Sequence, residues 1–114
     1  MTVIYGIPNC DKCRKATKWF DSKKIPYRFH DVRQDGLDTS MVKNWLKHVD
    51  AHELLNRRST TWRQLSDAER TGSGTADIAR LLVQHPTLLK RPLVESKAAV
   101  TVGYDERVWK ELYL

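Results

Sequence analysis

The chain has 114 residues, of which 40% are hydrophobic and 30% charged, and its mean hydropathy is −0.59. This length suits one domain, residues 1–114, with a single modest core, and no apolar run approaches the roughly 20 residues of a transmembrane helix. A net charge of +6 favours an anionic partner: an oxyanion, the carboxylates of glutathione, an acidic protein surface or nucleic acid. No basic motif interleaved with aromatic residues supports direct contact with nucleic acid, and no segment suggests a membrane.

The first residues include no apolar run that would serve as a signal peptide, so the cytoplasm is the expected compartment. The chain has two cysteines, Cys10 and Cys13. In a reducing compartment such a pair cycles between thiols and disulfide and does not act as a permanent crosslink. A zinc site is disfavoured, because two thiols need two further ligands and the four histidines lack metal-ligand spacing.

Residues 4–20 combine the end of a strand, a short loop and the start of a helix. Val3–Tyr5 suits a buried strand, which Gly6 and Pro8 end. Residues 11–24 contain neither Gly nor Pro and have a helical apolar spacing, so a helix is expected there, with Asn9 as its N-cap.

The start of that helix is a favourable position for a thiolate. Free backbone amides and the positive end of the helix dipole converge on Cys10, and Lys12, Arg14 and Lys15 add positive charge. Cys13 follows one turn later and can reach Cys10 to form a disulfide. The alternative is that both cysteines are ordinary small core residues.

After a turn at Ile25-Pro26, residues 27–31 alternate in the manner of a strand. A strand, a helix and a strand within about thirty residues form a βαβ unit with parallel strands. Residues 33–38 are expected to be a polar loop, and Asp38 is expected to cap a helix. The apolar stripe of that helix consists of Val42, Trp45, Leu46 and Val49.

Residues 53–63 are less regular. They suggest a short helical turn anchored by Leu54 and Leu55, then a polar loop with Arg57, Arg58 and Arg63. These arginines are candidates for an anion cradle, with a solvated loop as the alternative. Residues 71–74 are the stretch expected to be most flexible, and Thr75 begins a helix that ends at His85-Pro86.

The last part of the chain predicts an antiparallel hairpin and a final helix. Pro92 has no amide to donate, so it suits the start of a strand over 93–95. A second strand over 99–102 follows a turn at 96–98, and Asp105 caps a helix with Val108 and Leu112 facing inward. The fold class is therefore α/β: a mixed four-stranded sheet in βαβ…ββα order, with a helical insertion at about 38–87.

Several motifs in this order resemble a known family. They are Tyr-Gly-Ile-Pro-Asn-Cys at 5–10, Cys-Arg-Lys-Ala at 13–16, Leu-Leu-Asn-Arg-Arg-Ser-Thr-Thr-Trp at 54–62 and Lys-Arg-Pro-Leu at 90–93. They are similar to motifs of the arsenate reductase (ArsC)-related family, which has a thioredoxin-like fold. The likeness is strongest to the YffB-like proteins, and the Spx regulators are relatives with the same C-x-x-C.

The resemblance implies site residues. Cys10 corresponds to the family's nucleophile, and Arg91, before a cis Pro92, corresponds to an anion-binding arginine. The second arginine of arsenate reductases falls at Asn56, so Arg57 or Arg58 is expected to replace it, while the third falls near Gly103, which has no basic side chain. Arsenate reductases generally lack the second cysteine that Cys13 supplies here. Asn9, Lys12 and Pro92 complete the expected anion-binding loop.

Three functions remain open from the sequence. The first is a thiol-dependent reductase in which Cys10 attacks an oxyanion or a disulfide, and Cys13 or glutathione resolves the intermediate. It needs no bound cofactor or metal, with glutathione as co-substrate and glutaredoxin as a possible partner. The second is an Spx-like redox switch that binds RNA polymerase, and the third is a family member without catalysis. The physiological substrate is not defined by these residues.

Overall fold

The computed structural model describes residues 1–71 and 74–114, and it forms two compact units. One consists of residues 1–31 with 91–114, and the other of the described residues in 32–90. The flexibility predicted for 71–74 falls partly on Gly72 and Ser73, which lie outside the described residues.

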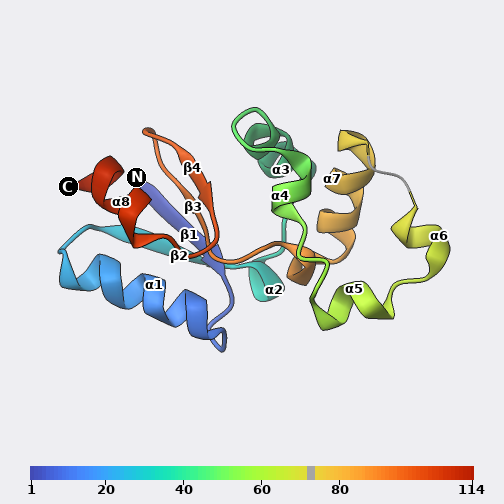
Figure 1. Ribbon diagram of the computed structural model, residues 1–114, viewed down its shortest axis with the longest axis horizontal. Helices are drawn as coiled ribbons and strands as arrows, with labels where there is room; N and C mark the ends of the chain where they lie inside the picture. The colour runs from blue at the N-terminus through green and yellow to red at the C-terminus, as the bar shows by residue number, and fades with distance from the viewer. Residues whose placement is uncertain (72–73) are drawn as a thin grey trace. The chain divides into compact units, whose positions relative to one another are not determined.

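The first unit is built on the predicted mixed sheet. Its strands are β1 (Thr2–Gly6), β2 (Tyr27–Asp31), β3 (Leu93–Glu95) and β4 (Val100–Val102), and its helices are α1 (Asp11–Ser22) and α8 (Glu106–Tyr113). The strand order is β2-β1-β3-β4, with β1 parallel to β2, and β3 antiparallel to both β1 and β4 (Figure 1). Both the βαβ unit and the hairpin are therefore confirmed.

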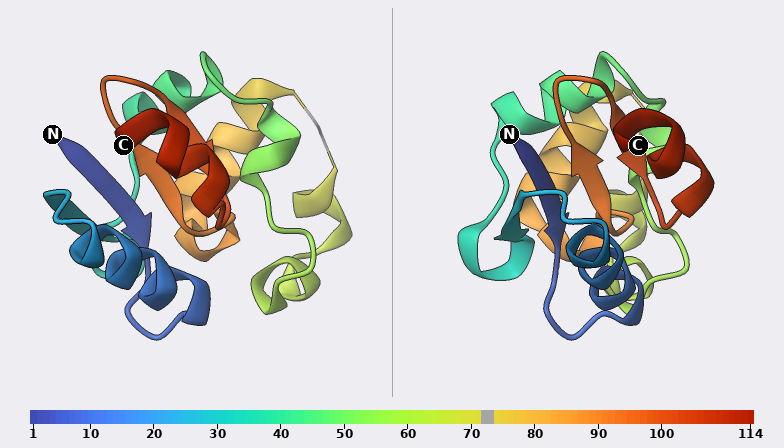
Figure 2. Two further views of the ribbon diagram at one scale, coloured as in Figure 1. Left: turned by 60° about the vertical axis from the view of Figure 1, so that its left-hand side comes forward. Right: turned by 90° about the vertical axis from the view of Figure 1, so that its left-hand side faces the viewer.

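An aromatic core joins α1 and α8 to one face of this sheet (Figure 2). The sheet contributes Ile4 and Val94, and Trp19, Phe20 and Trp109 form a ring cluster with centroids 5.1 to 5.5 Å apart. Trp109 is fully buried, whereas Val108 and Leu112 are only half-buried. The inward face predicted for the last helix is thus wrong by one position, because the large indole occupies the centre of the core.

The ends of α1 also differ from the prediction. The helix ends at Ser22, and Lys24 has a φ of 57°, which turns the backbone out of the helix. The N-cap is Cys10 and not Asn9, and in the described part of the chain no side chain caps this helix.

The second unit is helical and covers the predicted insertion. Its helices are α2 (Val32–Asp35), α3 (Thr39–Leu46), α4 (Ala51–Leu54), α5 (Thr60–Gln64), α6 (Asp67–Arg70), α7 (Thr75–Gln84) and the 3₁₀-helix η1 (Pro86–Leu88). Helices α3 and α7 pack against each other (Figure 1). Asp38 caps α3 as predicted, with its carboxylate accepting a 2.8 Å hydrogen bond from the Met41 amide.

Several short elements of this unit were not predicted. The polar loop expected over 33–38 begins instead as α2, which the fully buried Val32 anchors before Gly36 turns the chain at a φ of 73°. Helix α3 ends at Leu46, so Val49 lies beyond the helix. Residues 60–64 and 67–70 are single helical turns, each closed by a serine cap. Such turns are too short for an apolar period to show in the sequence.

A pair of extended segments ties the middle of the second unit to its end. Leu55 forms an antiparallel bridge with Leu89. The Asn56 amide donates to the Leu88 carbonyl, and the Lys90 amide to that of Leu54, both at 2.8 Å. Within the described residues, none of the helices has the length and apolarity required to cross a bilayer.

Candidate functional site

Cys10 lies at the point where the loop after β1 becomes α1. Its backbone is extended, with φ −101° and ψ 124°, and its carbonyl accepts the first bond of the helix, 2.9 Å from the Arg14 amide. The Cys10 amide closes the preceding turn on the Ile7 carbonyl at 3.3 Å. The side chain is partly exposed, so the sulfur combines access to solvent with the free amides of a helix start.

The surroundings of Cys10 favour its thiolate. Burial is the largest single influence and raises the pKa of Cys10, but the combined opposing influences outweigh it and leave the pKa below its ordinary value of 9.0. These are hydrogen bonds from the Cys13 amide and thiol, a hydrogen bond from the Lys12 amide, and the positive charge of Arg91. Three of them are local donors, as expected at a helix N-terminus.

Cys13 has the opposite character. It is 1% exposed, and burial, together with the hydrogen bond and the charge of Cys10, raises its pKa to about 12. A hydrogen bond from the Ile7 backbone and the charge of Arg91 lower the pKa only partly. Cys13 is therefore a neutral thiol that can donate a hydrogen bond to an ionised Cys10.

Gly6 allows this packing of Cys13. A Cβ added to Gly6 would overlap the Cys13 sulfur and would lie 3.3 Å from the Cys13 Cβ. The glycine thus serves a close approach of the β1 backbone to the buried thiol. The sequence shows this glycine only as a strand end, because the contact depends on how α1 sits on β1.

Arg91 and Pro92 stand at the start of β3, in the same unit as the cysteines. The Arg91–Pro92 bond is cis, as the family resemblance predicted, and the Pro92 carbonyl accepts a 2.9 Å hydrogen bond from the Gly103 amide. Arg91 is half-buried, and its charge acts on both thiols. The structure therefore brings Cys10, Cys13 and Arg91 together, and their use in catalysis remains a prediction.

Asn9 and Lys12 are the other two residues predicted for the anion-binding loop. Lys12 acts on Cys10 through its backbone amide, while its side chain is exposed, and the Asn9 side chain is exposed as well. Contact of Asn9 and Lys12 with an anion remains a prediction.

Arg57 and Arg58 belong to the second unit. Arg57 Nη2 lies 3.1 Å from His52 Nδ1, and the guanidinium carbon is 5.5 Å from the centroid of the Trp62 ring. The Arg58 amide donates to Asn56 Oδ1 at 3.1 Å, and the Arg58 carbonyl accepts from Arg63 at 3.4 Å. All three arginines are exposed and lie in one short segment. Their share in binding the substrate of Cys10 remains a prediction.

The sequence did not reveal a pocket of about 310 Å³ beside the buried thiol. Ile7 and Pro8 line it from the loop, Cys13, Arg14 and Thr17 from α1, and Tyr27 and Phe29 from β2.

Residues 1–71 and 74–114 contain no group of three or more His, Cys, Asp or Glu side chains arranged to hold a metal ion.

Known proteins match nearly the whole chain in sequence and in structure. The model of the ArsC family matches residues 5–112. The solved structure of the YFFB protein superposes with a TM-score of 0.95 at 31% identity and covers 100% of both chains. An arsenate reductase (ArsC) related protein from Brucella melitensis is 35% identical, with a TM-score of 0.73 and coverage of 98% of this chain and 93% of that one. The global transcriptional regulator Spx of Bacillus subtilis is 29% identical over 93% of this chain and 82% of its own.

Proposed function

The chain belongs to the ArsC family, and from the unequal pair Cys10 and Cys13 we propose that it is a thiol-dependent reductase. The observation that carries this proposal is that one helix turn holds an accessible thiol with a lowered pKa and a buried thiol with a pKa of about 12. A nucleophilic thiolate with a second thiol one turn away suits thiol–disulfide exchange in which the second thiol resolves the mixed disulfide.

The proposed cycle begins with Cys10. Its thiolate attacks one sulfur of a disulfide R–S–S–R′, forms a Cys10–S–S–R bond and releases R′–S⁻. Cys13 then loses its proton to the departing thiolate or to water, attacks the Cys10 sulfur and releases R–S⁻. The protein is left with a Cys10–Cys13 disulfide, and two molecules of glutathione, oxidised to their disulfide, restore both thiols. Glutathione can also resolve the mixed disulfide directly, in which case Cys13 is not required.

Developing negative charge during these steps falls beside fixed positive groups. The amides of Lys12 and Cys13 point at the Cys10 sulfur, and the Arg91 charge reaches the same place. Such donors stabilise an anion without reorganisation. They suit an oxyanion substrate as well as a thiolate leaving group, so arsenate and a glutathione mixed disulfide are both candidates. Arg57 and Arg58 are proposed as secondary anion contacts, and the reducing cytoplasm as the compartment.

A turnover assay tests this proposal. Purified protein is given arsenate or the mixed disulfide of glutathione and 2-mercaptoethanol, each with glutathione and glutaredoxin, and NADPH use is followed through glutathione reductase. Turnover should be lost in Cys10→Ser and reduced, but kept with added glutathione, in Cys13→Ser. Ser22→Ala is a matched control, since its hydroxyl lies at the other end of α1. No turnover above the Cys10→Ser background with either substrate would refute the proposal.

A second function rests on the Spx relative, a transcriptional regulator. In this alternative, oxidation of Cys10 and Cys13 changes a surface that binds RNA polymerase. Pull-down of polymerase subunits with reduced and with oxidised protein separates the two functions. Binding that depends on the redox state, without turnover, would favour the regulator.

A further inference from the structure

The pocket beside Cys13 lies on the side of the redox pair that faces β2. Its volume of about 310 Å³ is near the lower end of the roughly 300–1,000 Å³ usual for ligand pockets, so it suits one large side chain better than a whole cofactor. Cys13 forms part of its wall, and the loop residues Ile7 and Pro8 that lead to Cys10 form another part. A group held in this pocket would therefore lie next to the Cys13 sulfur and beside the loop that leads to Cys10.

Part of the polar surface around the pocket already has partners within the protein. The Thr17 hydroxyl donates to the Arg14 carbonyl at 3.0 Å, and the Arg14 guanidinium pairs with Asp11. Burial and the neighbouring Asp21 raise the pKa of the Tyr27 hydroxyl, so it stays protonated. A neutral polar ligand group would find the Thr17 hydroxyl already engaged, whereas the Arg14 side chain, 55% exposed, keeps donors available for an acidic group at the rim of the pocket. The carbon surface that Ile7, Pro8 and Phe29 contribute to the pocket wall instead favours an apolar group.

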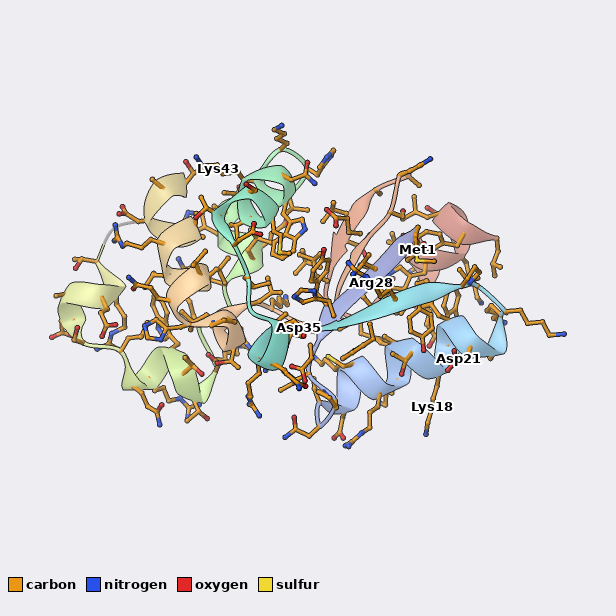
Figure 3. The ribbon with its side chains drawn as sticks, turned by 180° about the vertical axis from the view of Figure 1, so that it is seen from behind. Met1, Lys18, Asp21, Arg28, Asp35 and Lys43 are labelled. Carbon is orange, nitrogen blue, oxygen red and sulfur yellow. The ribbon has the colours of Figure 1, made fainter. Side chains whose placement is uncertain are left out.

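The helix that borders the pocket is strongly basic. Helix α1 contains four Lys and Arg residues against two Asp residues, and Lys23 and Lys24 follow directly after it. Arg14 is at the pocket wall, and Lys18, one turn further along α1, points away from the sheet into solvent (Figure 3). A partner that approaches along α1 with acidic residues therefore meets a complementary charge.

We propose that this pocket receives a large apolar side chain next to the reactive cysteine of an acidic peptide or protein disulfide, and thereby sets the substrate preference of the Cys10–Cys13 pair. This inference rests on the proposed reductase function and deepens it by naming the substrate class. The apolar side chain positions the target sulfur at the mouth of the loop, and the acidic neighbours bind the cations of α1. Glutathione itself has no large apolar side chain, so it acts as the reductant and does not fill the pocket.

Three acetylated pentapeptides, each a mixed disulfide with 5-thio-2-nitrobenzoate, test the proposal. The first is Asp-Glu-Cys-Leu-Glu, the second replaces leucine by glycine, and the third replaces the acidic residues by lysine. Attack of the Cys10 thiolate on the peptide sulfur releases the coloured thiolate, whose appearance gives a second-order rate constant. The leucine peptide should react about tenfold faster than the glycine peptide, the gain expected when one aliphatic side chain is partly buried. It should also react faster than the lysine peptide, with a difference that shrinks as salt is added.

Two substitutions on α1 provide a matched pair. Thr17 and Ser22 both donate their hydroxyl to the carbonyl three residues earlier, at 3.0 and 2.8 Å, but only Thr17 lines the pocket. Thr17→Phe should fill the pocket and bring the ratio of the leucine-peptide rate to the glycine-peptide rate close to one. Ser22→Phe should keep the wild-type preference. A thermal melt of each variant shows that it is folded.

The outcomes distinguish failure of the pocket assignment from failure of the proposed reductase function. Equal rates for the leucine and glycine peptides, or a preference that survives Thr17→Phe, would overturn the pocket assignment and leave the reductase function standing. No release of the coloured thiolate beyond that of the Cys10→Ser variant, with any of the peptides, would refute the reductase function and the inference together.

Discussion

Reaction of the native protein with iodoacetamide should separate the two thiols by rate. The perturbation is a brief exposure of reduced protein to the reagent between pH 5 and 9, because only the thiolate is alkylated at a useful rate. Cys10 should be labelled first, and its rate should rise with pH with a midpoint below pH 9.0, since its pKa is lowered from that value. Cys13 should show no such midpoint in this range.

The size of the difference follows from the ionisation of the two groups. At pH 8 a thiol with a pKa of about 12 is ionised to about one part in 10⁴, whereas one with a pKa below 9.0 exceeds about one part in ten. Ionisation thus favours Cys10 by more than about 10³. A more basic thiolate is the better nucleophile, with a Brønsted coefficient of about 0.4–0.5, which reduces the advantage to about 30-fold when the pKa of Cys10 lies just below 9.0. Burial of Cys13, at 1% exposed, increases the difference again.

Peptide mapping by mass spectrometry gives both rates in one sample. Cys13→Ser should be labelled at nearly the wild-type rate and Cys10→Ser very slowly, while in urea both positions should be labelled equally. Comparable rates at the two cysteines of the folded protein, or faster labelling of Cys13, would refute the assignment of Cys10 as nucleophile.

Three further substitutions test the surroundings of the pair. Arg91→Ala should raise the pKa of Cys10, seen as a shift of the labelling midpoint to higher pH, and weaken sulfate binding in calorimetry by about tenfold or more, since charge-assisted hydrogen bonds contribute about 1.5–3 kcal/mol. An unchanged midpoint and affinity, or a collapsed fold, would make this arginine structural. Gly6→Ala should cost about 1–3 kcal/mol in urea unfolding because its Cβ would overlap a buried sulfur, whereas Gly74→Ala, whose Cβ would lie 3.6 Å from Asp77 Oδ2, should be nearly neutral. Equal effects would argue against close packing at the thiol. Asp105→Ala should lower stability by about 1 kcal/mol through loss of the α8 cap, with recovery in Asp105→Asn, and no change in the melt would contradict the capping role.

Local patterns were enough for much of the fold. The Gly/Pro loop and the cysteine spacing predicted a helix that begins beside Cys10, and the structure differs only in making Cys10 itself the N-cap. Asp38 and Asp105 were recognisable as caps because a short carboxylate before an apolar period has a specific partner in the next turn. Helix α2 was missed, since its four residues are held by the burial of Val32 and show no period of their own.

By itself, the sequence determined the order of the strands and of the longer helices, the family, and the position of two thiols at the start of the first helix, because these depend on contacts between near neighbours. It also predicted the burial of Val42 and Trp45 on α3, but only the tertiary structure decided how the other elements pack around the site. Trp109 fills the core between α1 and the sheet, Gly6 makes room for Cys13, and Tyr27 and Phe29 complete a pocket with α1. The same packing separates the pKa values of the two cysteines. Desolvation of Cys13 and the approach of Arg91 both come from residues distant in sequence, which no local spacing encodes.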